Sequence, residues 1–213
     1  MKVAGIAFDE EVISLNAQDF KARVTKISGT GKVPALVDGE VAVWESLAIM
    51  EYLADRHGGV LPTDADARAW ARCAAAEMHS GFQALRNICS MSCGVRVKLG
   101  SQPEALVKDI ARLGELWTEG LRRHGGPFLA GKEFGGVDAF FCPVAFRVQS
   151  YGLELPPEAA AYARRLLAMA SMKRWYEAAL AEPHRDPDHD AEIAQAGKVV
   201  QDLRVSARAT ATT

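Results

Sequence analysis

The chain has 213 residues, of which 49% are hydrophobic and 24% charged, and its formal net charge is −2. This composition is typical of a globular protein with one large or two small domains. The charge and the lack of a basic cluster argue against nucleic acid or a membrane surface as a partner. No apolar run is long enough to span a membrane and no signal peptide is recognisable, so we predict a cytoplasmic protein.

The first sixty residues have the pattern of a small α/β unit. Residues 8–15 are predicted to form a strand, although only the last three alternate in polarity. Residues 19–27 are predicted to be a short helix or an irregular segment. A turn cluster at residues 28–31 follows, with two glycines.

A hairpin and a helix follow this turn. Val33–Pro34 leads into a short apolar strand at residues 35–37, and Asp38–Gly39 is a two-residue hairpin signal. The returning strand covers residues 41–44. Glu45–Ser46 then begins an apolar-periodic segment that reads as a helix and ends at the glycines after His57.

From residue 65 onward the periodicity is helical, so two architectures meet near residue 62. The predicted helices cover residues 68–86, 104–123, 138–151, 156–169 and 172–181. We therefore divide the chain into an α/β domain at residues 1–61, an all-helical domain at 65–182, and a polar linker and tail at 183–213.

The ordered set of loop, Val33–Pro34, hairpin and Glu45–Ser46 helix start resembles the glutathione-binding half of a glutathione S-transferase. Residues 134–138 resemble the helix-start motif of that family's second domain, with Asp138 at a position where its carboxylate can bond the first backbone N–H. Residues 77–86 are similar to the first long helix of bacterial zeta-like members. The resemblance covers roughly residues 2–183 and implies a thioredoxin-like α/β domain, here incomplete, followed by an all-α helical bundle.

The resemblance implies a glutathione site built from five residues. The backbone of Val33, before a cis bond to Pro34, would pair with the cysteinyl part of glutathione. Glu45 would hold the γ-glutamyl ammonium, and Ser46, at a helix N-terminus, the γ-glutamyl carboxylate. Lys32 would reach another carboxylate of the tripeptide.

The same resemblance places a second-substrate pocket on the first long helix. His79, Phe82, Gln83 and Arg86 are the candidate wall residues, and Arg96 is a candidate for attracting an anionic substrate. The alternative is an ordinary helix whose polar side chains are solvated or cap a neighbour.

The residue that activates the glutathione sulfur in this family is unassigned here. A Ser, Tyr or Cys near the first strand normally donates a hydrogen bond to that sulfur and favours the nucleophilic thiolate. Because residues 1–10 resemble the last turn of the family's first helix, we expect the activating residue to lie before Met1. About 20 residues of strand and helix would then be absent. We do not expect Ser14, Ser28 or Thr30 to replace this activating residue.

Two ligand-rich segments favour ordinary structure over metal binding. Cys89 and Cys93 lie on one helical face, but no partner ligands recur nearby, so we predict no metal and four free thiols. The charged, proline-containing residues 183–190 indicate a solvated linker. The apolar residues from Ile193 to Leu203 are compatible with a short amphipathic helix, and residues 207–213 with disorder.

The sequence therefore favours a homodimeric, glutathione S-transferase-like enzyme. It would use glutathione as co-substrate to conjugate or isomerise a small electrophile. The alternative is a non-catalytic glutathione-family binding or scaffold protein, because the activating residue is missing. A thioredoxin-like oxidoreductase is disfavoured, because the first domain contains no cysteine.

Overall fold

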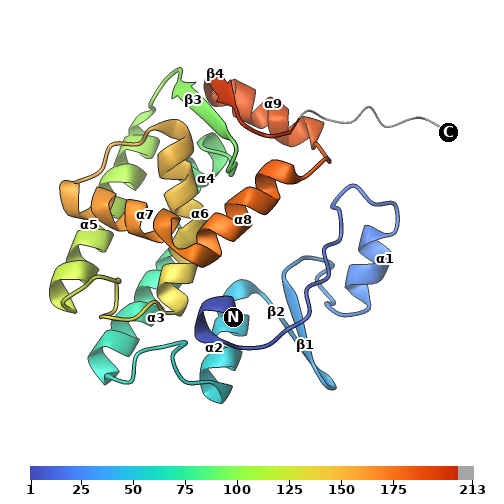
Figure 1. Ribbon diagram of the computed structural model, residues 1–213, viewed down its shortest axis with the longest axis vertical. Coiled ribbons are helices and arrows are strands. Elements are labelled where there is room, and N and C mark those ends of the chain that lie inside the picture. The colour runs from blue at the N-terminus through green and yellow to red at the C-terminus, as the bar shows by residue number, and fades with distance from the viewer. Residues whose placement is uncertain (206–213) are drawn as a thin grey trace.

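Two regions of unequal size make up the structure, a computed structural model that describes residues 1–205. The N-terminal region, residues 1–61, lies on one side of the helical body, residues 65–205 (Figure 1). The elements of the N-terminal region are a 3₁₀ helix η1 at Lys2–Ala4, α1 at Phe20–Thr25, β1 at Ala35–Asp38, β2 at Val41–Trp44 and α2 at Ser46–Arg56. Those of the body are α3 at Ala65–Ser80, α4 at Gln83–Ile88, β3 at Val95–Leu99, α5 at Glu104–Arg123, α6 at Gly136–Tyr151, α7 at Pro157–Ala168, α8 at Ala170–Ala181, α9 at Pro187–Ala196 and β4 at Gly197–Asp202.

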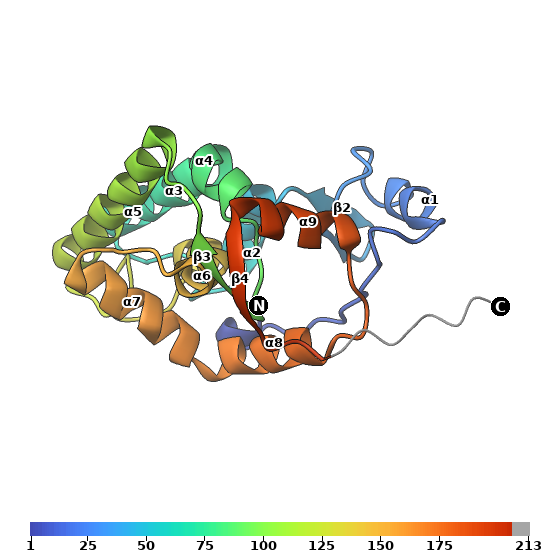
Figure 2. The ribbon, with the colours of Figure 1, turned by 90° about the horizontal axis from the view of Figure 1, so that it is seen from above.

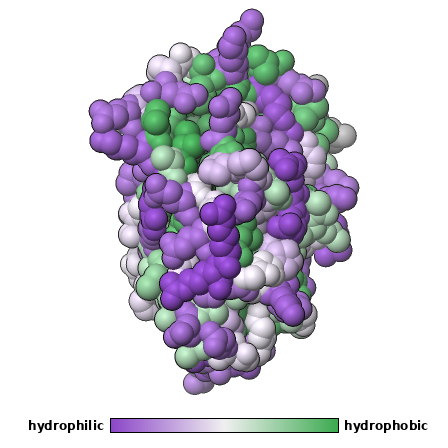
Figure 3. Space-filling view, turned by 90° about the vertical axis from the view of Figure 1, so that its left-hand side faces the viewer, coloured by the Kyte–Doolittle hydropathy of each residue, from purple (hydrophilic) through white to green (hydrophobic). Residues whose placement is uncertain are grey.

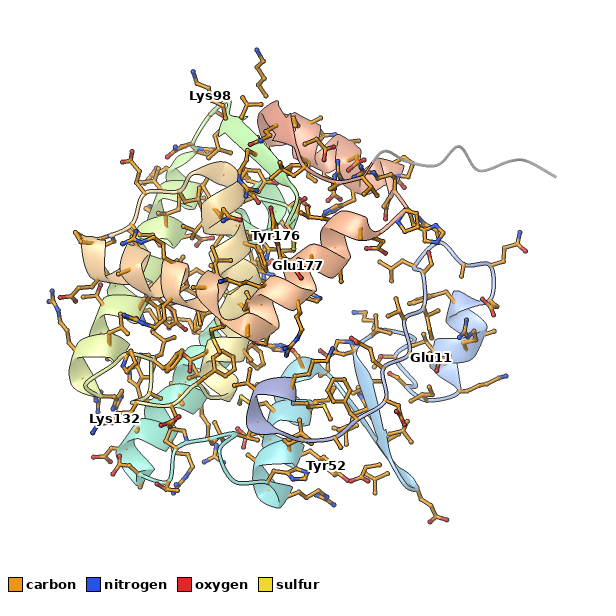
Figure 4. All side chains as sticks on the ribbon, viewed as in Figure 1. Glu11, Tyr52, Lys98, Lys132, Tyr176 and Glu177 are labelled. Carbon is orange, nitrogen blue, oxygen red and sulfur yellow. The ribbon has the colours of Figure 1, made fainter. Side chains whose placement is uncertain are left out.

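The predicted hairpin and the helix after it are confirmed. β1 and β2 pair antiparallel, and Gly39 takes the positive φ of 60° that their two-residue loop requires. The Tyr52 hydroxyl on α2 donates to Asp38 Oδ2 at 2.9 Å, and the Arg56 guanidinium lies 3.7 Å from the Tyr52 ring centre (Figure 4). These contacts fix the hairpin on α2 and so set where the start of α2 lies.

The predicted strand at residues 8–15 is wrong. This segment is irregular, and the side chains of Val12 and Leu15 are 80% and 64% exposed. A strand needs a neighbour to bind its backbone N–H and C=O groups, and none of the described strands pairs with this segment. The segment is held to α1 by an ion pair between Glu11, labelled in Figure 4, and Arg23.

The helical body has its core between α3, α5, α6 and α7. Trp117 of α5 meets Phe141 and Tyr162 edge-on, with ring centres 5.6 and 4.9 Å apart, and all three side chains are fully buried. Because α5 is amphipathic, its other side faces solvent, and Figure 3 shows this side of the body as largely hydrophilic with hydrophobic patches. The predicted helices at 104–123, 138–151, 156–169 and 172–181 are confirmed within two residues at each end.

The predicted helix at residues 68–86 is interrupted. α3 ends at Ser80, Phe82 adopts a left-handed conformation with φ of 55°, and α4 begins at Gln83. The break turns the Phe82 side chain into the core, where it is 5% exposed. Glycine at position 81 lowers the cost of leaving the helix there. Cys73 of α3 is exposed.

The second domain is not purely helical, because β3 pairs antiparallel with β4. Val95 and Val97 face the core and alternate with more exposed side chains. This period of two is typical of a strand with one buried face. The amphipathic helix predicted around Ile193 ends at Ala196, and Val199 and Val200 lie in β4 instead. α9 and β4 pack on the body (Figure 2), with Ile193 buried in its main core. The prediction for residues 207–213 lies outside the described residues.

The two regions meet where α2 approaches the start of α6. The Gly136 N–H donates to the Val60 carbonyl at 2.6 Å. A Cβ at position 136 would lie 2.7 Å from Met50 of α2, so glycine is what permits this approach. Met50, Leu53, Val60 and Ala75 form the small apolar cluster at the junction.

Candidate functional site

A cleft of about 560 Å³ runs between the N-terminal region and the helical body. Its N-terminal wall contains Pro34 and the start of α2. Its opposite wall comes from α3, α4, α6 and the loop before β3. The N-terminal wall includes Pro34, Ser46, Ile49 and Met50. The opposite wall includes His79, Arg86, Met91, Phe140, Pro143 and Arg147.

Two of the five predicted glutathione residues line this cleft, Pro34 and Ser46. The bond from Val33 to Pro34 is cis, as the resemblance implies. Ser46 is the first residue of α2, where backbone N–H groups have no partner within the helix. These unpaired donors and the helix dipole favour an anionic group at this end of the cleft.

Lys32, Val33 and Glu45 lie beside the cleft rather than in its wall. Val33 is 48% exposed, so its backbone is accessible next to Pro34. Glu45 caps α2 with a φ of 68°, a conformation that costs a non-glycine residue on the order of 1–3 kcal/mol and recurs at functional sites. This backbone turn presents Ser46 to the cleft.

A contact between side chains of the two regions lies beside the cleft. His79 Nε2 lies 3.9 Å from Glu45 Oε2, an ion pair when the imidazole is protonated. The structure thus brings His79, predicted for the second substrate, next to Glu45, predicted for the γ-glutamyl ammonium. Glu45 is exposed and His79 is half-buried, so both can also contact a ligand.

Three predicted substrate residues do not face the cleft. Phe82 is buried in the body, where the left-handed turn before α4 directs it. Gln83 is exposed, and its Nε2 donates to the Ser80 carbonyl at 3.1 Å, which caps the end of α3. Arg96 lies in β3, and its Nη1 donates to the carbonyls of Cys93 and Val95 at 3.2 and 2.8 Å. Of the predicted wall residues, His79 and Arg86 line the cleft.

Arg147 is the wall residue that sequence reasoning missed. It lies on α6, and its Nε donates to the Cys89 carbonyl at 2.8 Å. Burial, and secondarily the nearby Arg86 charge, lower the pKa of the Arg147 guanidinium below its ordinary value. The available signal was that Arg147 is the only charged residue of α6 after Asp138.

The cleft is basic and has few nucleophilic or activating groups. Among the described residues that line it there is no Asp, Glu, Cys or Tyr, and Ser46 carries the only side-chain hydroxyl. Burial raises the pKa of the thiols of Cys89 and Cys93 to about 11 and that of Cys142 to about 12. These thiols are therefore protonated near neutral pH and act as core side chains. Ser28 is fully buried with its Oγ 2.7 Å from Thr30 Oγ1, away from the cleft wall.

Asp138 has the structural role that the sequence predicts, with two further partners. Its carboxylate accepts from the N–H of Gly135 at 2.9 Å, as a helix cap does. It also accepts from the Leu129 N–H at 3.0 Å and from the Tyr162 hydroxyl at 2.8 Å. Burial raises the pKa of the carboxyl, an effect that these donors oppose. Asp138 thus joins the loop before α6, the start of α6 and α7.

Residues 1–205 contain neither a candidate metal site nor a candidate membrane-spanning helix. No cluster of three or more His, Cys, Asp or Glu side chains in this part of the chain has an arrangement that would hold a metal ion. None of the helices described is both long and apolar enough to cross a bilayer.

Comparison with known proteins agrees with this architecture. Residues 1–56 match the glutathione S-transferase N-terminal domain. A probable maleylacetoacetate isomerase of Caenorhabditis elegans is 27% identical over 164 residues, which cover 74% of each chain. A zeta-class glutathione S-transferase of Euphorbia esula is 30% identical over 132 residues, 61% of this chain and 59% of that protein.

A solved structure shares the fold. A glutathione transferase homologue from Burkholderia BGR1, with glutathione bound, superposes with a TM-score of 0.58 at 24% identity, covering 83% of this chain and 85% of that one. The match of residues 1–56, the relatives and the shared fold agree with the resemblance read from the hairpin and helix start. Residues 1–56 therefore match the N-terminal domain of glutathione S-transferases, and the chain as a whole is similar to members of that family.

Proposed function

We propose that the chain binds glutathione in the cleft between its two regions and uses it to conjugate or isomerise a small electrophile. The observation that carries the proposal is the placement of Pro34 and the start of α2 at Ser46 on one wall. That wall offers the exposed Val33, before the cis bond to Pro34, next to a set of unpaired helix N–H donors. A short peptide with a carboxylate at one end fits this pair of features.

In this arrangement each end of glutathione meets a complementary group. The cysteinyl part pairs with the Val33 backbone, and the γ-glutamyl carboxylate accepts from the Ser46 hydroxyl and N–H. Glu45 takes the γ-glutamyl ammonium, and Lys32 binds the other carboxylate. Glu45 is already 3.9 Å from His79, so we expect ligand binding to compete with that contact.

The chemistry that follows is attack by the glutathione sulfur. In conjugation, a sulfur–carbon bond forms and the leaving group departs with its electron pair. In isomerisation, the thiolate adds to a double bond, the carbon–carbon bond rotates, and elimination returns the thiolate. A relative named as a maleylacetoacetate isomerase and another named as a zeta-class transferase support both routes. We also propose that the protein is a homodimer, which light scattering of the purified chain would test. We further propose that it is cytoplasmic.

Binding is tested by titration calorimetry with glutathione. Replacing Ser46 by Ala removes one hydroxyl donor to a carboxylate, and we expect about a tenfold loss of affinity, the effect of about 1.4 kcal/mol. Ser101→Ala, at an exposed serine outside the cleft, is the matched control and should bind normally. Equal affinities of wild type and Ser46→Ala would refute the site.

A second candidate function is glutathione binding without catalysis. It is favoured by the single hydroxyl, Ser46, among the described cleft residues, because thiol activation needs a donor at the sulfur and Ser46 is assigned to the carboxylate. Turnover of 1-chloro-2,4-dinitrobenzene with glutathione separates the two. Binding with no turnover by the wild-type chain favours the non-catalytic role, whereas turnover that Ser46→Ala reduces favours the enzyme.

A further inference from the structure

Arg86 and Arg147 lie on the same wall of the cleft, and neither forms an ion pair with a described carboxylate. Arg86 comes from α4 and its Nη1 donates to the His79 carbonyl at 2.9 Å. Arg147 comes from α6 and its Nε donates to the Cys89 carbonyl at 2.8 Å. Each guanidinium carries five N–H donors, so each retains donors after its single bond to the protein.

The environment of Arg147 is unfavourable for a cation, whereas Arg86 is exposed. No acidic side chain lines the cleft among the residues described, and the nearest wall residues are apolar. Burial and the charge of Arg86 together disfavour the protonated form of Arg147 and lower its pKa. A cation that is partly removed from water without a counter-ion costs free energy that a bound anion would offset.

The surface next to the pair is suited to an apolar group. Phe140 and Pro143 of α6 and Met91 of the preceding loop line the same wall as Arg147. Aromatic, ring and thioether side chains accept flat apolar groups with little polar cost. The opposite wall has its own anion-binding feature, the start of α2 at Ser46, for the carboxylate of glutathione.

We propose that Arg86 and Arg147 form a carboxylate subsite for the second substrate, whose apolar or aromatic body packs on Phe140, Pro143 and Met91. The substrate class is therefore an apolar electrophile with a carboxylate. This inference rests on the proposed function for the position of glutathione, but the subsite itself can be tested without glutathione. Arg147 is held by the Cys89 carbonyl and Arg86 by the His79 carbonyl, so both guanidinium groups are oriented before a ligand arrives.

The first test uses a pair of fluorescent probes that differ in one charged group. 8-Anilinonaphthalene-1-sulfonate has an anionic group on an aromatic body, and N-phenyl-1-naphthylamine is its neutral analogue. We expect Arg86→Gln to weaken binding of the anionic probe about fivefold or more and that of the neutral probe less than twofold. Arg164→Gln, at an exposed arginine of α7 outside the cleft, should change neither.

Arg147 needs a second variant, because its bond to the Cys89 carbonyl also supports the fold. Arg147→Lys keeps a cation and a donor, whereas Arg147→Gln removes the charge. We expect the lysine variant to retain more affinity for the anionic probe than the glutamine variant. Equal loss of both probes in Arg86→Gln would overturn the subsite, and so would no loss of either.

The second test distinguishes a carboxylate on the second substrate from the carboxylates of glutathione itself. The affinities of glutathione, S-benzylglutathione and S-(4-carboxybenzyl)glutathione are compared in wild type and Arg86→Gln. The inference predicts that the variant loses affinity only for the carboxybenzyl compound. An equal loss for glutathione itself would assign the arginines to glutathione and overturn the inference. If no glutathione compound binds but the probe result holds, the proposed function fails and the anion subsite stands.

Discussion

The two walls of the cleft belong to regions that are packed very differently. In the helical body Trp117, Phe141 and Tyr162 are fully buried. In the N-terminal region Val37 and Trp44 of the hairpin are 55% and 44% exposed. This region contacts the body through a small apolar cluster, the Gly136–Val60 hydrogen bond and an ion pair between Glu51 and Arg72. The wall that we propose for the second substrate is therefore rigidly supported, whereas the wall that we propose for glutathione is held by fewer contacts. Such a region opens at a lower free energy and gains more order from a bound ligand.

The largest expected loss of stability comes from the body, at Asp138. Asp138→Ala leaves the N–H groups of Gly135 and Leu129 and the Tyr162 hydroxyl without their acceptor. We expect the free energy of unfolding in urea to fall by about 3–5 kcal/mol. Asp9→Ala, at an exposed aspartate with no described partner, should change it by less than about 0.5 kcal/mol. A loss below about 1 kcal/mol for Asp138→Ala would contradict the network.

The next effect tests whether α9 belongs to the body. Ile193 is almost fully buried in the main core, and His189 of the same helix contacts the Met91 carbonyl at 2.6 Å. We expect Ile193→Ala to reduce the free energy of unfolding by about 2–4 kcal/mol. Val200→Ala, in the exposed part of β4, is the matched control and should cost less than about 0.5 kcal/mol. Similar values for both variants would mean that α9 is a loosely attached tail.

A smaller effect is expected in the N-terminal region. Leu36 of β1 is half-buried and packs on the junction cluster. Leu36→Ala should cost about 1 kcal/mol, because a partly exposed side chain loses less apolar burial. Hydrogen exchange should show faster amide exchange in β1 and β2 and unchanged protection in α5 and α6. Uniform acceleration across both regions would show that they unfold as one unit.

The smallest effect concerns reactivity and leaves stability unchanged. Cys73 is exposed, whereas burial raises the pKa of Cys89 and Cys93 to about 11 and that of Cys142 to about 12. At pH 8 the native protein should therefore release one equivalent of thionitrobenzoate rapidly from Ellman's reagent, and four after denaturation. Cys73→Ser should remove the rapid phase. A rapid phase that persists in this variant would show that a buried thiol is accessible.

The sequence was sufficient for features with a strong local signal. The hairpin lies within one residue of its predicted place, with its loop at Gly39–Glu40, and the α2 start at Ser46 and the helices α5 to α8 lie where their patterns predict them. In the site, Pro34, Ser46, His79 and Arg86 reach the cleft wall. All four follow from local motifs or from helix faces near an element boundary.

The remaining features depend on contacts between distant segments. β3 has an alternating pattern, but whether it becomes a strand is decided by its partner β4. The left-handed turn at Phe82 is stabilised by burial of that side chain in the body, which periodicity alone does not reveal. Arg147 enters the site because α6 packs between α3 and α7, which requires the tertiary arrangement.

The pairing of β3 with β4 has a consequence for synthesis. Val95 pairs with Asp202, so the ribosome makes the second strand roughly a hundred residues after the first. At about 5–20 residues per second, β3 waits on the order of 5–20 s with an open edge. During that interval the nascent body exposes backbone donors and acceptors that favour pairing with other chains. The arrival of α9 and β4 closes this edge, so variants that weaken them should aggregate during expression even when the finished protein is stable.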